Sequence, residues 1–260
     1  MAESTLSIAF ADLKSEVGYF LGYGRTVASF TAAQSALVIA LVQSGVRRVY
    51  YPTAAGPDSG YEWSWLRPTT TLSITANDGD YDLPDSFARI LGNFHYAADV
   101  MQPEIKQISA EQILELRSSS DQNDDPWFFA VRPKAFPSTA VGQRWEVIFY
   151  PEPNAARTLY YSYEAYSGVL SDTVTYPLGG MQLAELYIES CLAVAEQKVK
   201  DAAGLHSQAY QALLADAIAR DRKRGAKWFG SMGHKETEYE EFHHGDTATP
   251  YPVTYKTIVY

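Results

Sequence analysis

The chain is poor in the residues from which covalent and metal-bound frameworks are built. It has 260 residues but a single cysteine, Cys191, and only five histidines. One thiol excludes an internal disulfide and a zinc site built from several cysteines. Because Leu192, Ala193 and Val194 follow Cys191, we expect this residue to be a small buried side chain within a helix.

Long apolar runs are also missing. The longest near the start, Ala36–Val42, is far shorter than the roughly 20 residues that a membrane span requires. The first 16 residues place no basic region ahead of an apolar stretch, so we expect no secretory signal and no membrane partner. With 46% hydrophobic and 13% aromatic residues, the chain can still bury a substantial core.

Motifs for catalysis and cofactor binding are absent from the sequence. It contains no GxGxxG or GxxxxGK[ST] phosphate loop, no GxSxG elbow and no HExxH pair. The adjacent residues His243 and His244 lack a third ligand at fixed spacing, so they are better interpreted as solvated side chains. We therefore expect a protein without enzymatic activity, cofactor or bound metal.

One chemical alternative stays open around two tryptophans. Trp63 and Trp65 lie upstream of an acidic group that includes Asp80, and aromatic rings beside carboxylates are typical of sugar clefts. The competing interpretation is structural, because Asn77-Asp78-Gly79 is a turn signal and Asp80–Asp82 resembles a strand with one polar face. A carbohydrate-binding or hydrolytic module is therefore the less favoured function.

The charge of the chain is strongly negative. Its 31 acidic and 21 basic residues give a formal net charge of −10, which disfavours a generic nucleic-acid coat. The basic residues nevertheless gather in two places, and these are Arg220, Arg222, Lys223, Arg224 and Lys227, with a smaller pair, Arg47 and Arg48. They either stabilise the negative ends of helices or contact an acidic partner or DNA in a channel.

Two helices are predicted at the start of the chain. Apolar residues recur at helical spacing from Leu6 to Leu21, and the glycines Gly22 and Gly24 follow as a stop signal. Thr31 and Gln34 form a capping-box pair that begins a second helix, which we expect to close at Gly45.

The middle of the chain, from Tyr50 to Tyr166, is predicted to be an antiparallel sheet or a small sandwich. Short alternating runs near Leu72, Trp145 and Leu159 are typical of strands. The segment Pro151–Asn154 lies between the last two runs and is predicted to be a hairpin connection. One short helix is expected where Ser109 and Gln112 form another capping box.

Helical periodicity returns after Pro177 and predicts two further helices, one closed by Gly204 and one ending near Gly225. The fold class is therefore α+β, with a helical bundle interrupted by an antiparallel β insertion. The predicted organisation is N-terminal helices in residues 1–49, a β-rich insertion in 50–176, C-terminal helices in 177–225 and an extended arm in 226–260.

The predicted arm has an unusual composition for a free terminus. Residues 235–241 are polar and mostly acidic, and the last ten residues are apolar and rich in tyrosine. Such a segment would collapse or aggregate unless it docks elsewhere, for example by adding as a strand to another chain. Folding back onto its own domain is the alternative. The candidate docking residues are Trp228, Phe229, Tyr251, Val253, Tyr255, Ile258, Val259 and Tyr260.

Seven short segments occur along the chain in a distinctive order and spacing, and these are Tyr19–Gly24, Ser44–Pro52, Gly60–Pro68, Tyr81–Phe87, Gly142–Glu146, Tyr150–Pro151 and Leu159–Tyr163. In this order they resemble the head-to-tail adaptor, or connector, proteins of tailed bacteriophages. The resemblance covers roughly residues 5–225 and rests on the order and spacing of many segments rather than on one diagnostic motif.

The resemblance implies a structural virion protein rather than an enzyme. Members of this family are helical bundles, some with a β insertion, that form a dodecameric ring in the neck of the virion after assembly in the host cytoplasm. The ring lies between the portal protein above and the tail proteins below, and genomic DNA passes through its channel. A C-terminal arm commonly reaches the portal. A tail-terminator or tail-tube ring protein is the structural alternative, disfavoured because tube proteins are mostly sheet.

Overall fold

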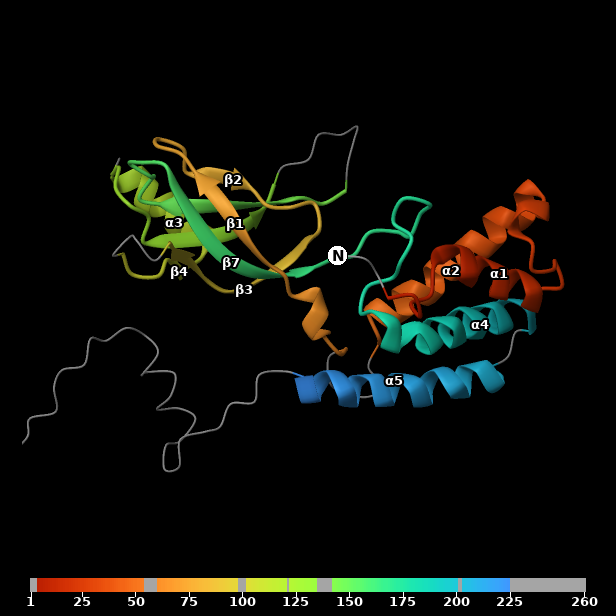
Figure 1. Cartoon of the computed structure of the whole chain (residues 1–260). Helices are drawn as coiled ribbons and strands as arrows, with labels where there is room; N and C mark the ends of the chain where they lie inside the picture. The colour runs from red at the N-terminus through yellow and green to blue at the C-terminus, as the bar shows by residue number, and fades with distance from the viewer. Residues whose placement is uncertain are drawn as a thin grey trace, which may run out of the picture.

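The computed structural model describes residues 4–53, 60–97, 102–120, 122–134, 142–200 and 203–224. Within them the fold is mixed α+β, as predicted, and Figure 1 shows the strands together with the helix Ala110–Ser119 in one group and the other helices in a second. The α-helices are α1 (Phe10–Phe20), α2 (Ala32–Tyr50), α3 (Ala110–Ser119), α4 (Ala184–Lys200) and α5 (Leu205–Arg224). The strands are β1 (Thr69–Ile74), β2 (Asp80–Asp82), β3 (Phe87–Tyr96), β4 (Lys106–Gln107), β5 (Phe128–Pro133), β6 (Trp145–Tyr150) and β7 (Arg157–Ala165).

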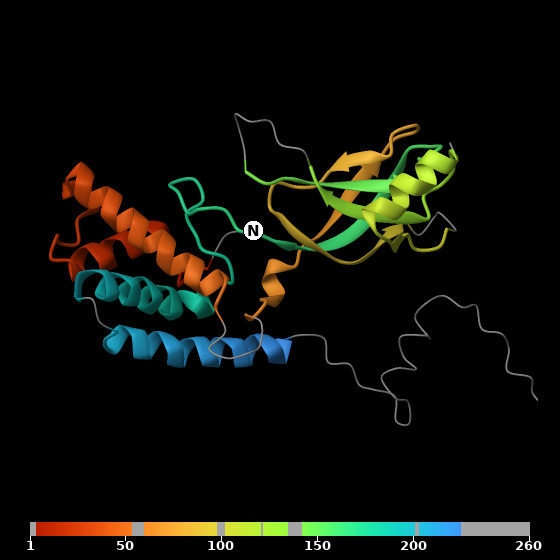
Figure 2. The same cartoon turned by 180° about the vertical axis from the view of Figure 1, so that it is seen from behind.

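Helices α1, α2, α4 and α5 share one hydrophobic core. α4 lies against each of the other three, and the N-terminal pair is thereby joined to helices more than 130 residues later in the chain. The core contains fully buried side chains from α1, α2 and α4, among them Leu13, Leu41, Val49 and Tyr187, and α5 adds the buried Ala217. Figure 2 shows the same stacking from behind, with α4 between α5 and the N-terminal helices. In the described part of the chain, no helix has the length and apolar character needed to cross a membrane.

The predicted start of the second helix is confirmed, but its predicted end is wrong. Thr31 Oγ1 accepts from the Gln34 amide at 3.3 Å, and Gln34 Oε1 accepts from the Thr31 amide at 2.8 Å. The helix then passes through Gly45 and continues to Tyr50. The reason is packing: a Cβ at Gly45 would lie 2.7 Å from Cys191 Cα, so the glycine allows α2 and α4 to cross closely.

The first helix begins later than its apolar periodicity predicts. It starts at Phe10, where the Ala9 amide donates to Asp12 Oδ2 at 3.0 Å, and Leu6 lies outside it with 72% of its surface exposed. The predicted stop is confirmed, since Gly22 and Gly24 follow the helix with φ of 79° and 91°.

The strands form two sheets with the orders β1-β7-β3 and β2-β6-β5-β4. All pairings are antiparallel, as predicted, except the short parallel pair of β4 with β5. Ile74 and Phe94 from one sheet and Phe129 and Phe149 from the other belong to one buried cluster. The sheets therefore pack as a small sandwich, one of the two predicted forms.

The hairpin predicted around Pro151–Asn154 is wrong, because β6 and β7 belong to different sheets. The alternation expected in β6 is also lost, since Val147, Ile148 and Phe149 are all buried. Phe149 faces the sandwich core, whereas Ile148 joins Ile113 of α3 in a separate cluster. Helix α3, whose predicted capping box is confirmed, thus covers the outer face of this sheet.

Candidate interaction surfaces

The predicted basic group lies at the exposed C-terminal end of α5. Arg222, Lys223 and Arg224 occupy its last turn, and Arg220 forms an ion pair with Asp216 one turn earlier. Cations at this end stabilise the helix dipole, so one of the two predicted interpretations has a physical basis here. Lys227 lies outside the described residues.

A buried carboxylate interrupts this basic run and fixes the end of α5. Asp221 is 6% exposed and accepts from the Tyr61 hydroxyl at 2.7 Å, the Ser64 amide at 2.9 Å and the Ser64 hydroxyl at 2.6 Å. Desolvation acts to raise the pKa of Asp221, but the hydrogen bonds from Ser64 and Tyr61 outweigh it and lower that pKa. The end of α5 is thereby tied to the segment that leads into β1.

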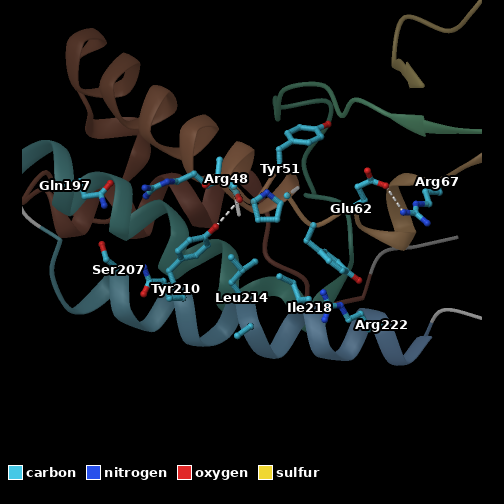
Figure 3. Close-up of a pocket in the computed structure, with 16 residues that line it drawn as sticks. Arg48, Tyr51, Glu62, Arg67, Gln197, Ser207, Tyr210, Leu214, Ile218 and Arg222 are labelled. Carbon is cyan, nitrogen blue, oxygen red and sulfur yellow. Dashed lines mark hydrogen bonds and ion pairs between the residues drawn. The ribbon is translucent and has the colours of Figure 1, made fainter. Parts of the chain in front are cut away.

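A groove of about 1140 Å³ runs beside α5, between this helix, the end of α2 and residues 60–67. We call it the α5 groove. Figure 3 shows side chains from α5 and α2 converging on it. Its apolar wall is formed by Leu214 and Ile218, and its tyrosines are Tyr51, Tyr61 and Tyr210. The lining is therefore aromatic and apolar, with charged side chains at its edges.

The groove brings together members of the two predicted basic groups. The Arg48 guanidinium lies 6.0 Å from the Tyr210 ring centroid, and that of Arg222 lies 5.5 Å from the Tyr61 ring centroid. The Tyr210 hydroxyl also donates to the Arg48 carbonyl at 3.0 Å. Neither guanidinium has a carboxylate partner among the residues that the structure describes. Arg47, in the last turn of α2, is exposed and does not line the groove.

The third arginine of the groove is already neutralised. Arg67 lies 2.9 Å from Glu62, which also pairs with Arg89, and Arg89 pairs in turn with Glu164 at 2.7 Å. Among the described residues that line the groove, this chain of ion pairs leaves Arg48 and Arg222 as the cations available to a ligand.

A second surface is the connection between β7 and α4. We call residues 166–181 the apolar loop. Its backbone is held against α2, since the Leu170 amide donates to Gln43 at 3.2 Å and the Leu178 amide donates to the Tyr50 hydroxyl at 2.9 Å. Six large apolar side chains, each between 40% and 67% exposed, nevertheless project from it, and these are Tyr166, Val169, Val174, Tyr176, Leu178 and Met181.

Exposed apolar side chains that are grouped in this way usually mark an interaction site. Figures 1 and 2 both show the apolar loop in teal, between the helices and the strands. The sequence holds only a weak signal, apolar residues scattered without strand or helix periodicity among serine, threonine, glycine and proline, and the structure is needed to show that they are exposed.

The residues proposed for a sugar site do not come together. Trp63 is 1% exposed and donates to the Val49 carbonyl at 2.7 Å, and Trp65 stacks on it within the helical core. Asp80 lies on β2, as predicted, and is paired with Arg117 at 2.8 Å and Arg132 at 3.5 Å. The tryptophans are core residues, and the carboxylate is part of a separate ion-pair cluster.

The remaining polar candidates are also accounted for. Cys191 is fully buried in α4, as predicted, and burial raises the pKa of its thiol to about 12. His206, at the start of α5, lies 2.9 Å from Glu189, a partner that sequence proximity did not reveal. Within the described ranges, no group of three or more His, Cys, Asp or Glu side chains could hold a metal ion.

Several predicted positions lie outside the described residues. They include His243 and His244, and also the docking residues Trp228, Phe229, Tyr251, Val253, Tyr255, Ile258, Val259 and Tyr260. Their predicted roles therefore stay predictions.

Comparison with known proteins identifies the family. The family model of the SU10 adaptor protein matches residues 8–233, which include the four core helices and both sheets. The chain belongs to the SU10 adaptor protein family. The resemblance to phage head-to-tail adaptors is thereby confirmed. A search of curated proteins finds no match.

The structure also shows which residues of this adaptor the sequence analysis missed. Tyr61 and Tyr210 line the α5 groove, and Asp221 anchors it, but none was singled out. A signal for Asp221 exists: it follows Ala217 by four residues and so lies on the buried face of α5 rather than with the exposed arginines.

Proposed function

We propose that this adaptor forms a ring in the neck of a phage virion, between the portal and the tail. The observation that supports the proposal is the family match, which runs through helices and sheets alike rather than over one motif. The helices α1, α2, α4 and α5 then act as one bundle, into which residues between α2 and α4 insert the β sandwich. The protein has a structural role and no catalytic one.

A closed ring requires each subunit to offer two different surfaces, one to each neighbour. The apolar loop is one suitable surface, because its side chains remain uncovered within the subunit. A dodecamer is the stoichiometry implied by the family resemblance. The ring extends the DNA channel, and DNA passes through without sequence recognition, which a net charge of −10 permits.

The arm, residues 226–260, is proposed to reach the portal through its last ten residues. These combine β-branched and tyrosine side chains, the composition of a strand that adds to another sheet. The free energy gained by binding to the portal would have to offset the conformational entropy lost when the arm takes one conformation.

The test uses purified portal rings and two forms of the adaptor. Deletion of residues 251–260 should weaken portal binding at least tenfold while the thermal unfolding midpoint stays unchanged, because the deletion removes only part of the arm. Surface plasmon resonance and thermal denaturation provide the two readouts. Equal portal affinity of both forms would refute the arm's role.

The basic end of α5 allows a second test. Charge reversal of Arg222 and Arg224 should hinder ring assembly and change the melting temperature little, because both side chains are exposed. Sedimentation velocity measures the assembly. A large loss of stability would instead assign these arginines to the helix-end role alone.

A further inference from the structure

We propose that the acidic segment Glu236–Phe242 docks into the α5 groove of the same molecule. The proposal concerns the free subunit and goes beyond the proposed function, because it stands whether or not the assembled ring binds a portal. It assigns a ligand of stated chemistry, an acidic and aromatic peptide, to a groove of which the function above uses only Arg222.

The groove has the features that such a peptide needs. Arg48 and Arg222 have no carboxylate partner among the described residues and lie over tyrosine rings. Leu214 and Ile218 form a half-buried apolar wall between them. A guanidinium beside a tyrosine can bind a carboxylate in a fixed plane while the neighbouring ring packs against an aromatic side chain.

The segment has the complementary features. Residues 236–242 contain four glutamates together with Tyr239 and Phe242, and no basic residue. Among 260 residues with only 31 acidic ones, this is a strong local concentration of negative charge. Charge complementarity of this kind directs two surfaces to one another and fixes their register.

The dimensions of the two partners agree. The groove follows α5 from Ser207 to Arg222, which is about 22 Å at the rise of an α-helix. Seven extended residues span about 23 Å. One peptide strand of this length can therefore contact both the Arg48 and the Arg222 guanidinium.

Connectivity favours docking within one molecule. Eleven residues, 225–235, join the end of α5 to the segment, and three of them are glycines. Fully extended they reach about 36 Å, enough to return along the groove. A tether of this length gives an effective concentration in the millimolar range, well above that of a second copy in dilute solution.

The experiment places a cysteine pair in the full-length chain. Gln211→Cys puts a thiol on the exposed lining of the groove, and Thr237→Cys puts one in the segment without removing a charge. The native Cys191 is fully buried and does not compete. The matched control combines Thr237→Cys with Ser118→Cys, an exposed position on α3.

The proposal predicts an intramolecular disulfide that forms at least tenfold faster in the groove pair than in the control pair. The rate should be independent of protein concentration and should fall in 0.5 M salt, since exposed charges are then screened. Arg48→Glu with Arg222→Glu should slow the reaction at least fivefold. Adding Glu236→Lys and Glu238→Lys to that protein should restore it.

Three results would overturn the proposal. They are equal rates in the groove and control pairs, disulfides that form between chains with a concentration-dependent rate, and rates unaffected by the charge reversals. If the double reversal disturbs folding, Arg222→Glu alone, at an exposed position, must still slow the reaction. Portal binding is measured separately, so failure here does not decide the proposed function.

Discussion

Individual side chains determine how the end of α5 is held. Asp221 stands between arginines in the sequence, yet it is buried and accepts three hydrogen bonds, whereas the neighbouring basic side chains are exposed. A buried acceptor of this kind is expensive to remove because its donors are left without partners. One carboxylate therefore connects the helical core to the entry of the sandwich.

Replacement of Asp221 by Asn should lower the free energy of unfolding by about 1–3 kcal/mol, because an amide cannot accept from all three donors. Urea denaturation at pH 7 measures the loss. Asp216→Asn is the control, because Asp216 is an exposed residue of the same helix that pairs with Arg220. This variant should lose less than about 1 kcal/mol of unfolding free energy. Equal losses for the two variants would contradict the anchoring role.

The pH dependence of this anchor follows from its lowered pKa. An unfolded aspartate titrates near 3.9, so the stabilisation is fully present above that pH and disappears as the pH falls through the lower folded pKa. The difference in stability between the native protein and Asp221→Asn should therefore narrow below about pH 4. Urea titrations at pH 3 and pH 7 test it, and a constant difference would contradict this assignment.

Cys191 should be chemically silent in the folded protein. Burial raises the pKa of its thiol to about 12, so at pH 8 it is neither ionised nor accessible. A thiol-specific dye should react with the folded protein only as fast as the protein unfolds. The urea-unfolded chain should react at once with one equivalent of the dye. Rapid labelling of the native protein would show that the α2–α4 contact opens.

Secondary-structure elements show where sequence patterns succeed and where they fail. The capping boxes at Thr31 and Ser109 are local devices, and both were predictable from residues three positions apart. The end of α2 was not predictable in this way. Taken alone, Gly45 looks like a helix stop, but in the structure it lies within α2 and allows the helix to cross closely over α4. The predicted pairing of β6 with β7 failed for a similar reason: β7 pairs instead with β1 and β3, which come from a distant part of the chain.

The helix crossing itself gives a prediction. Gly45→Ala gains helix propensity, but its Cβ would lie 2.7 Å from Cys191 Cα, and backbone cannot move aside cheaply. We expect a net loss of about 1–3 kcal/mol in thermal or urea unfolding. Gly18→Ala is the comparison: its Cβ would meet the end of the Phe30 ring, with backbone no nearer than the Gly24 carbonyl at 3.3 Å, so it should cost less. The opposite order would refute this explanation of the long α2.

The candidate surfaces were predictable only in part. The basic residues of the α5 groove stood out in the sequence, but their meeting depends on α2 and α5 both packing against α4, which no local pattern reveals. The sequence alone does not predict that the apolar loop is a surface either. Valines such as Val169 and Val174 are usually buried in a core, and only the structure shows that here they are exposed.

At the scale of the whole molecule, the apolar loop is a surface that is exposed in the single subunit and that a ring would bury. Val169→Ser with Val174→Ser should change the free energy of unfolding by less than about 0.5 kcal/mol per site, since both side chains are more than half exposed. The same variant should lose self-association in sedimentation experiments. Leu114→Ser, at a 50% exposed position on α3, is the control and should assemble normally. Normal assembly of both variants would exclude the apolar loop from the subunit interface.

Electron microscopy of the full-length adaptor, alone and mixed with its portal, provides the decisive test of an assembly role. We predict closed rings seated coaxially on the portal, with density for the arm reaching the portal surface. Solitary monomers that remain unbound after mixing, at concentrations where portal rings are intact, would contradict the account.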